Sequence, residues 1–207
     1  MNNPFPECWA LVPVKARALG NSRLAGTLDV SQRCTLGREM VRHVLAVLRE
    51  SRGIDRIAIV SVERDDVPDD ILHFVDTDTC LTATLVAAIA EARAAGATRI
   101  VIVPADLPNV SRADIDELVA AASACGIAIA PDRHRRGTNG LAFDIELPMP
   151  ICFGNDSFRR HRQSARALGI EPAIVVLSGL AFDLDDSDDW HALSPAVRSA
   201  MTSEALM

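Results

Sequence analysis

The sequence predicts an α/β protein in which a mostly parallel central sheet lies between two layers of helices. Short apolar runs alternate with amphipathic helical patterns along the chain. The runs are apolar at both sets of alternating positions, as in strands that helices cover on both faces. Neither an internal repeat nor a low-complexity linker divides the 207 residues, so we expect a single domain over 1–207. Ligands of such sheets bind beyond the carboxyl ends of the strands, which makes the loops there the candidates for chemistry.

Apolar periodicity predicts three elements in the first third of the chain. A short apolar run followed by a polar loop predicts a buried strand over 9–14. Apolar residues then recur at helical spacing from position 36 to 48, which predicts a helix with Ser31 as its N-cap and Gly53 at its end. Residues 56–62 are apolar at both alternating sets of positions and predict a second buried strand.

The middle of the chain continues the alternation. The Ala-rich segment 82–95 predicts a helix closed by Gly96. A strand over 99–103 ends at a proline, and Ser111 with Asp114 has the spacing of a capping box that opens a helix through position 124. An apolar run then predicts a strand over 127–130.

The last third of the chain carries shorter signals. Strands are expected over 141–144 and 173–176, and a basic helix over 157–168 that stops at Gly169. A short helix is expected over 186–193. The negative charges expected at its N-terminus belong to Asp186, Asp188 and Asp189.

Composition excludes several classes of protein. A formal net charge of −7 and 4% aromatic residues argue against a nucleic-acid-binding protein, which usually has a basic surface and stacking aromatic side chains. No run approaches the 18 consecutive apolar residues of a spanning helix, and the first residues lack the pattern of a signal peptide. We therefore expect a cytoplasmic protein without a membrane or nucleic-acid partner.

The cysteines and two of the histidines carry no metal-site pattern. Five cysteines without a C-x-x-C pair fit neither a disulfide framework nor a zinc site, so we expect them to be small buried side chains. His134 and His161 have no metal partner in the sequence and are expected at the surface. The cysteines are Cys8, Cys34, Cys80, Cys125 and Cys152.

The loop after the first expected strand is basic. Lys15, Arg17 and Arg23 lie there among small residues, where a nucleoside triphosphate would need cations to balance its charge. Lys15 is the single lysine among 21 basic residues, and a general bias toward arginine does not explain its place directly after a strand. The loop matches neither the Walker A nor the G-x-G-x-x-G fingerprint, and a solvated basic loop is the alternative interpretation.

Three aspartates follow expected strands or extended segments. Asp106 lies between two prolines that stiffen its backbone, just past the strand over 99–103. Asp183 and Asp185 share one face if the chain is extended there, because side chains alternate with period two. Two carboxylates on one face repel each other unless a cation lies between them, and Mg²⁺ binds to one or two carboxylates plus phosphate oxygens. We expect Mg²⁺ here; a turn-capping aspartate and an acidic tail are the alternatives.

A polar and basic stretch over 132–140, together with the small residues near 153–158, predicts an anion site. Free N–H groups at a helix N-terminus attract anions, so Thr138, Gly154 and Ser157 are candidates for holding a small phosphorylated acid. The alternative for the neighbouring arginines is a solvated loop. They are Arg133, Arg135 and Arg136.

Five short segments occur in a specific order along the chain. They are Val12-Pro13-Val14-Lys15 with Ser22-Arg23-Leu24, then Pro104-Ala105-Asp106-Leu107-Pro108, Pro131-Asp132-Arg133 leading to Gly137-Thr138-Asn139, Phe153-Gly154 with Ser157-Phe158, and Asp183-Leu184-Asp185. In this order they resemble the 2-phospho-L-lactate guanylyltransferases of coenzyme F-420 biosynthesis, and the similarity covers nearly the whole chain. Similar proteins usually carry lysine at the position of Asn21, and many carry Leu-Asn where this chain has Leu81-Thr82.

The resemblance implies a three-layer nucleotidyltransferase fold, Rossmann-like and of the GT-A type, and a role for each site residue. Members of the family that it resembles transfer GMP from GTP to 2-phospho-L-lactate, phosphoenolpyruvate or 3-phospho-D-glycerate and release pyrophosphate. A homodimer is a further implication. We expect Lys15 and Arg23 to act in catalysis by stabilising the triphosphate. By resemblance, Mg²⁺ binds Asp106, Asp183 and Asp185; the phosphorylated acid binds Lys15, Thr138, Gly154 and Ser157; and the nucleotide binds Val12, Lys15, Arg23 and Thr82.

Two other functions remain open on the sequence. The same fold and metal site would serve another Mg²⁺-dependent nucleotidyl transfer, to a sugar phosphate or to a molybdopterin-like acceptor. A non-catalytic nucleotide-binding module is the second alternative. Three aspartates expected to converge argue against it, because mutually repelling carboxylates need a cation between them.

Overall fold

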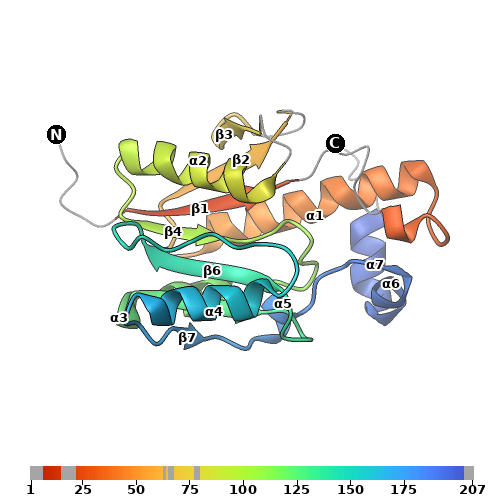
Figure 1. Cartoon of the computed structure of the whole chain (residues 1–207). Helices are drawn as coiled ribbons and strands as arrows, with labels where there is room; N and C mark the ends of the chain where they lie inside the picture. Colours follow the sequence, from red (N-terminus) through yellow and green to blue (C-terminus); the bar gives the residue numbers. More distant parts are fainter. Residues whose placement is uncertain (1–6, 15–21, 63, 65–67, 77–79, 203–207) are drawn as a thin grey trace.

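The computed structural model describes residues 7–14, 22–62, 64, 68–76 and 80–202, and within them the chain forms a seven-stranded sheet (Figure 1). The strand order is β3-β2-β1-β4-β6-β5-β7. Every neighbouring pair is parallel except those of β6, which runs antiparallel to both β4 and β5. The mostly parallel sheet predicted from the sequence is therefore confirmed. The strands are β1 (Cys8–Pro13), β2 (Arg56–Ser61), β3 (Leu72–Val75), β4 (Arg99–Ile102), β5 (Ile127–Pro131), β6 (Thr138–Asp144) and β7 (Ala173–Ile174).

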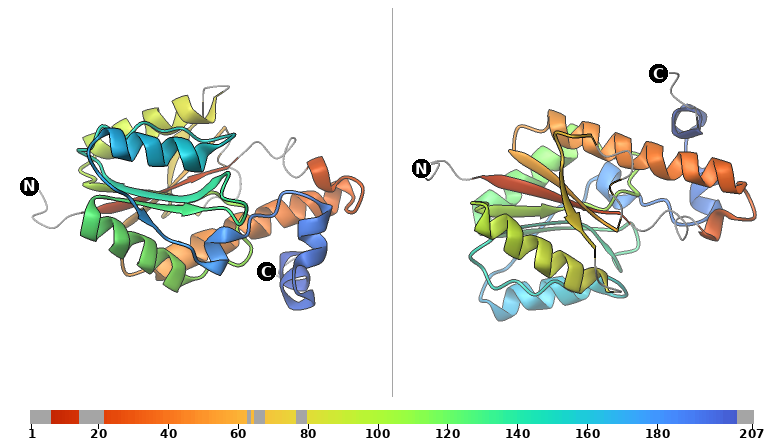
Figure 2. Two further views of the ribbon diagram at one scale, coloured as in Figure 1. Left: turned by 60° about the horizontal axis from the view of Figure 1, so that its bottom comes forward. Right: turned by 90° about the horizontal axis from the view of Figure 1, so that it is seen from above.

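Helices cover both faces of this sheet (Figure 2). Alternation along β1 shows the two cores: Trp9 and Leu11 belong to a cluster with α2 and α4, whereas Ala10 and Val12 belong to a cluster with α1 and α3. Both sets of side chains are essentially inaccessible to solvent, which explains why the strand is apolar at every position. The four covering helices are α1 (Val30–Glu50), α2 (Leu81–Ala94), α3 (Arg112–Cys125) and α4 (Ser157–Ala167).

A third, smaller core lies beyond the sheet, around the N-terminal half of α1 (Figure 1). There Leu36 and Met40 of α1 pack with Leu24, Trp190 and Met201. This packing places residues 22–24 next to the C-terminal part of the chain, which brings Arg23 to Asp185. The elements involved are η2 (Ser22–Leu24), α6 (Ser187–Ala192) and α7 (Pro195–Thr202).

Several element boundaries differ from those expected. Asp29, not Ser31, is the N-cap of α1: its side chain accepts from the N–H of Gln32 at 2.8 Å, and the Gln32 side chain accepts from the N–H of Asp29 at 2.9 Å. The helix ends at Glu50 rather than at Gly53. Strand β3, the short helix α5 (Ser178–Ala181), η2 and α7 were not predicted.

The expectation of buried cysteines is confirmed at Cys8 alone; Cys34 and Cys152 are only partly buried. Cys8 is buried, and burial raises the pKa of its thiol to about 12, but Cys80 and Cys125 are exposed. No disulfide bond joins any two of these five described cysteines. Among the described residues, no helix is long and apolar enough to cross a membrane.

Gly179 in α5 allows a close approach that no other residue type allows. A Cβ at this position would meet the Asn109 carbonyl oxygen at 2.7 Å and would also overlap the Asp114 carboxylate, which caps α3. We expect Gly179→Ala to lower the free energy of unfolding by about 1–3 kcal/mol because backbone and cap must shift to make room. Chemical denaturation followed by circular dichroism measures this. Gly26→Ala is the control, because nothing lies within 4 Å of a Cβ there, and equal stability of the two variants would contradict the prediction.

Candidate active site

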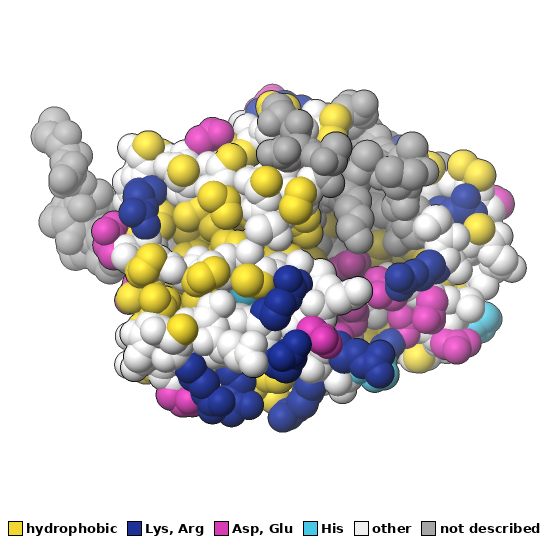
Figure 3. All heavy atoms as spheres, viewed as in Figure 1, with side chains coloured by type: hydrophobic (Ala, Val, Ile, Leu, Met, Phe, Trp, Pro, Cys, Tyr) yellow, Lys and Arg dark blue, Asp and Glu magenta, His cyan; other side chains and the backbone are white. Residues whose placement is uncertain are grey.

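The predicted site lies where three segments meet beyond the sheet. The N–H of Leu184 donates to the carbonyl oxygen of Asp106 at 2.9 Å, and the N–H of Arg133 donates to that of Ala181 at 2.8 Å. These backbone bonds join the loop after β4 and the loop after β5 to the segment between α5 and α6. In the space-filling view, acidic side chains gather between the end of the sheet and α6, with basic side chains beside them (Figure 3).

Asp183 carries an electrostatic cost in this site. Its carboxyl is half-buried, and burial raises its pKa above the ordinary value. The negative charges of Asp185 and Asp132 raise the pKa further, whereas the amide of Asn139 lowers it. The fold therefore brings three carboxylates of one sign near each other, an arrangement that a bound cation would relieve.

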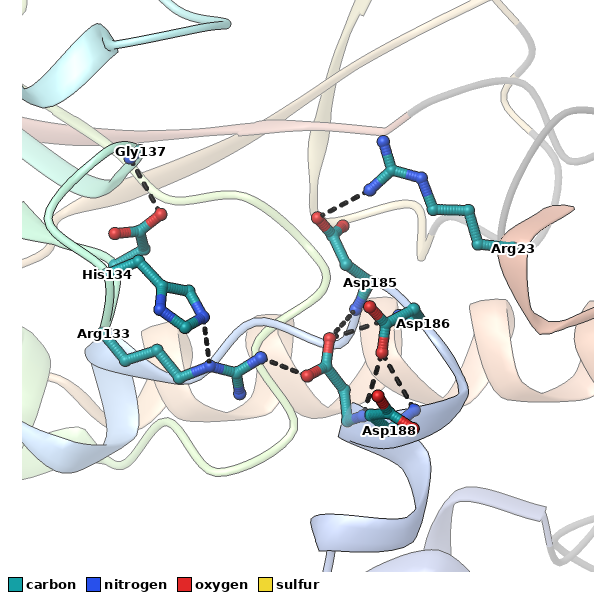
Figure 4. Close-up of polar contacts among 9 residues, drawn as sticks. Arg23, Arg133, His134, Gly137, Asp185, Asp186 and Asp188 are labelled. Atoms are coloured by element: carbon teal, nitrogen blue, oxygen red, sulfur yellow. Dashed lines mark hydrogen bonds and ion pairs between the residues drawn. The ribbon is translucent and has the colours of Figure 1, made fainter.

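Arg23 is the one described cation that meets these carboxylates directly. Its guanidinium pairs with the Asp185 carboxylate at 3.2 Å, and both side chains are more than half exposed (Figure 4). Arg23 belongs to η2, and its partner Asp185 lies 162 positions later in the sequence. The third core packs the neighbouring residues Leu24 and Leu184 together and so keeps the two side chains close. An exposed guanidinium beside carboxylates is able to turn toward phosphate oxygens when they arrive.

The donor set suits a hard divalent cation without completing its coordination. Carboxylate oxygens of Asp183 and Asp185, with Asp106 in the adjoining loop, are the ligand type that Mg²⁺ prefers. In the described part of the chain, no group of three or more His, Cys, Asp or Glu side chains is arranged to hold a metal ion. Mg²⁺ usually keeps few protein ligands and completes its shell with water and substrate phosphates, so the residues fit a site of this open kind. The Mg²⁺ site stays a prediction.

Asp189 connects the acidic segment to Arg133, one of the labelled residues in Figure 4. Its buried carboxylate accepts from the N–H groups of Asp185 at 2.9 Å and Asp186 at 3.2 Å, and it pairs with Arg133. The Arg133 guanidinium also lies over the Phe182 ring, 4.6 Å from its centre. Asp186 is the N-cap of α6 and Asp189 completes its capping box, which confirms the predicted acidic N-terminus.

The candidate anion site has a different construction from the expected one. The N–H of Ser157 donates to the Gly154 carbonyl at 3.0 Å, and the N–H of Phe158 donates to the Arg136 carbonyl at 3.1 Å. Two of the N–H groups at the start of α4 are therefore already used inside the protein, and the expectation that this helix end is free was wrong for them. These bonds nevertheless place the start of α4, with Gly154 and Ser157, against the loop that leads to Thr138.

His161 occupies the centre of that arrangement, and its expected surface position is wrong. The imidazole is fully buried, with Nδ1 3.0 Å from the Thr138 hydroxyl oxygen and Nε2 accepting from the N–H of Cys152 at 2.9 Å. Burial, and to a lesser extent the charge of Arg160, lower the pKa of His161 to about 4. His134 is exposed, as expected.

The pKa of His161 predicts how stability depends on pH. Between about pH 6.5 and 4 the unfolded chain binds a proton at this residue that the folded chain does not, so the free energy of unfolding falls as the pH falls. The total loss expected over this window is about 3 kcal/mol. Urea unfolding of the wild type and of His161→Gln at pH 7, 6, 5 and 4 measures it. The variant lacks this ionisation and should lose less stability over the window; parallel curves would contradict the prediction.

The residues expected to bind the nucleotide are only partly visible. Lys15, Arg17 and Asn21 lie outside the described residues. The Val12 side chain is fully buried in the core near the end of β1, so it is not accessible to a ligand. Thr82 is half-buried in the first turn of α2.

Two site residues, His161 and Asp189, were not picked out as site residues from the sequence, although each had a signal. His161 lies three residues after Phe158 and four before Ala165, on the buried face of α4, so helical periodicity predicts its burial. Asp189 has the capping-box spacing from Asp186, but its pairing with Arg133 joins positions 56 residues apart. No local pattern reveals such a pair.

Comparison with known proteins identifies the family and the fold. The family model described as "Guanylyl transferase CofC like" matches residues 8–194. A phosphoenolpyruvate guanylyltransferase from Sphaerobacter thermophilus is 36% identical over 193 residues, which cover 89% of this chain and 91% of the relative.

A solved structure from Desulfovibrio desulfuricans, assigned as a nucleotide-diphospho-sugar transferase, has a TM-score of 0.77 at 17% identity, and the match covers 93% of this chain and 88% of that structure's chain. A 4-diphosphocytidyl-2C-methyl-D-erythritol synthase has a TM-score of 0.65 at 14% identity, with 96% and 100% covered. The predicted nucleotidyltransferase fold is confirmed.

Proposed function

The chain belongs to the CofC-like guanylyltransferase family, and from this premise we propose that it transfers GMP from GTP to a small phosphorylated carboxylic acid in coenzyme F-420 biosynthesis. The names of its relatives make phosphoenolpyruvate the first acceptor to test, ahead of 2-phospho-L-lactate and 3-phospho-D-glycerate. The observation that carries the proposal is the group of mutually repelling carboxylates beside Arg23, at the edge of the sheet where ligands of this architecture bind.

The reaction requires positioning and charge neutralisation from the protein. A phosphate oxygen of the acceptor forms a bond to the α-phosphorus of GTP while the bond from that phosphorus to the bridging oxygen of pyrophosphate breaks. The attacking phosphate is ionised at neutral pH, so no general base is needed. Two polyanions must nevertheless be held in line at short distance, and fixed opposing charges lower the barrier.

Asp106, Asp183 and Asp185 would hold Mg²⁺, which when bound supplies positive charge to the phosphates of GTP and acceptor. Arg23 lies at the rim of the same carboxylates, where its exposed guanidinium would leave Asp185 to pair with the departing pyrophosphate. We assign Lys15 the same task on the triphosphate and a contact with the acceptor.

The acceptor would lie against Thr138, Gly154 and Ser157, in segments that the hydrogen bonds of His161 and of the Phe158 N–H connect. The nucleotide would lie along the end of β1 and the first turn of α2, in contact with the backbone of Val12 and with Thr82. Thr82 lies two residues before Thr84, whose hydroxyl donates to the Asp76 carboxylate at 2.5 Å.

Pyrophosphate release tests the proposal. Purified protein is incubated with GTP and Mg²⁺ and, in separate reactions, with phosphoenolpyruvate, 2-phospho-L-lactate or 3-phospho-D-glycerate; CTP and ATP replace GTP in parallel reactions. We expect release that requires GTP, Mg²⁺ and one of the three acids. Release with a sugar phosphate instead would keep the nucleotidyl transfer and replace the acceptor. Absence of GTP binding in calorimetry would exclude the guanylyltransferase.

A further inference from the structure

The His161 imidazole connects all three parts of the candidate acceptor site. It belongs to α4, one turn after Ser157; its Nε2 binds the N–H of Cys152, two residues before Gly154; and its Nδ1 lies 3.0 Å from the Thr138 hydroxyl of β6. The Phe153 ring packs against it edge-on, with the ring centres 5.0 Å apart. His161 is fully buried and joins the three segments that carry the candidate acceptor-binding residues, so it is placed to define their geometry.

Hydrogen bonding determines the tautomer of this imidazole. A backbone N–H is only a donor, so Nε2 must present its lone pair to Cys152 and carries no proton. Because the buried ring is neutral at physiological pH, the single ring proton is then on Nδ1. Nδ1–H therefore donates to the Thr138 oxygen.

The tautomer in turn fixes the role of Thr138. Its oxygen is an acceptor toward His161, so its own O–H proton points away from the imidazole and is available as a donor. Among the described residues, the Thr138 hydroxyl makes no hydrogen bond other than the one with His161. Thr138 is 4% exposed, so the hydroxyl is held with little freedom, in a place where an unsatisfied donor is costly.

We propose that His161 is a positioning residue that orients the Thr138 hydroxyl as a hydrogen-bond donor to a phosphate oxygen of the acceptor acid. This inference rests on the proposed function and adds a residue that does not itself touch the substrate. Phosphate oxygens only accept hydrogen bonds, so a hydroxyl oriented as a donor favours phosphate over any group that must donate. The preorganised bond also spares the acceptor the cost of ordering this side chain on binding.

The first test reads the protonation state of the imidazole in the wild type. Two-bond ¹H–¹⁵N correlation spectra of the ¹⁵N-labelled wild type at pH 7 report which ring nitrogen of His161 carries the proton, with His161→Asn identifying the signal. We expect a neutral ring protonated at Nδ1. A ring protonated at Nε2, or a positively charged ring, would overturn the proposal whatever the enzyme's substrate is.

The second test separates positioning from folding. His161→Leu removes the donor at Nδ1, whereas the amide of His161→Asn places an N–H near the same position. We expect KM for the acceptor to rise about 10- to 100-fold in His161→Leu, the range for a lost hydrogen bond to a charged group, and to return most of the way in His161→Asn. KM for GTP should change less than threefold in both. An equal rise in both KM values, or no rescue by Asn, would overturn the proposal.

A double-mutant cycle with Thr138 completes the design. Thr138→Val should raise KM for the acceptor as much as His161→Leu, and the double variant should be no worse than either single variant, because both remove the same contact. Additive effects would show that His161 acts elsewhere. The two failures are distinguishable. Pyrophosphate release by a wild type whose His161 is protonated at Nε2 would overturn this inference alone, whereas absence of release with every acceptor would overturn the proposed function and the inference with it.

Discussion

Asp183→Asn is expected to reduce pyrophosphate release by about 100- to 1000-fold, the size of effect that follows from losing one fixed charge partner in a reacting polyanionic site. The substitution keeps the size and shape of the side chain but removes the charge that the predicted cation would balance. Steady-state rates at saturating GTP and acceptor, measured across a range of Mg²⁺ concentrations, give the effect. We expect added Mg²⁺ to recover little of the loss.

The same substitution should leave the protein as stable as before or more stable. Burial and the charges of Asp185 and Asp132 raise the pKa of the Asp183 carboxyl, so its ionised form costs folding free energy at every pH above its ordinary pKa. Asn carries no charge and removes this cost. Urea unfolding at pH 7 without divalent cations is the measurement. Loss of activity without loss of stability is the behaviour of a group kept for function at the expense of stability.

Asp188→Asn is the matched control, because Asp188 is an exposed carboxylate of the same acidic segment whose side chain forms no hydrogen bond or ion pair with another described residue. Its activity and stability should stay within about twofold and 0.5 kcal/mol of the wild type. If Asp183→Asn kept full activity, Asp183 would be removed from the catalytic site. If it lost activity and stability together, a structural role would explain both.

The parts of the fold that the sequence predicted are those whose local signals agree with their packing. The capping box of Ser111 and Asp114 set the start of α3, and the two apolar faces of β1 predicted its place between helix layers. At α1 the expected cap, Ser31, is wrong, and Asp29 forms the cap because Gln32 is correctly placed to bond back to it. Strand β3 has four residues and exists through its pairing with β2 at the edge of the sheet, so no local pattern identifies it.

The site divides in the same way. Asp106 stood out because two prolines flank it just past an expected strand, and Asp183 and Asp185 because their spacing places them on one face of an extended segment. The structure joins the loop of Asp106 to the segment of the other two by a backbone hydrogen bond. The role of His161 was missed because it depends on which nitrogen faces which segment, a property of tertiary structure. The Arg133–Asp189 pair was missed for the same reason, since the two residues lie 56 positions apart in the sequence.

That pair carries the second large effect. We expect Asp189→Ala to lower the free energy of unfolding by about 3 kcal/mol. The substitution leaves the partly buried Arg133 guanidinium without this ion-pair partner and removes the acceptor of two backbone N–H groups. It should also raise the Mg²⁺ concentration needed for half-maximal activity, since the N–H of Asp185 is one of those groups and the adjoining carboxylate loses its support. Unlike Asp183→Asn, this variant should recover activity as Mg²⁺ is increased.

Asp188→Ala isolates the contribution of the buried contacts from that of charge alone, since both substitutions remove one carboxylate from the first turn of α6. We expect Asp188→Ala to unfold within about 0.5 kcal/mol of the wild type. Arg133→Gln combined with Asp189→Ala should be less destabilising than the sum of the single changes, because each single change leaves the other charge unpaired. If Asp189→Ala were as stable as Asp188→Ala, the ion pair would not hold the acidic segment. The position of Asp185 would then depend on the third core, through Leu184 and Trp190, rather than on Arg133 and Asp189.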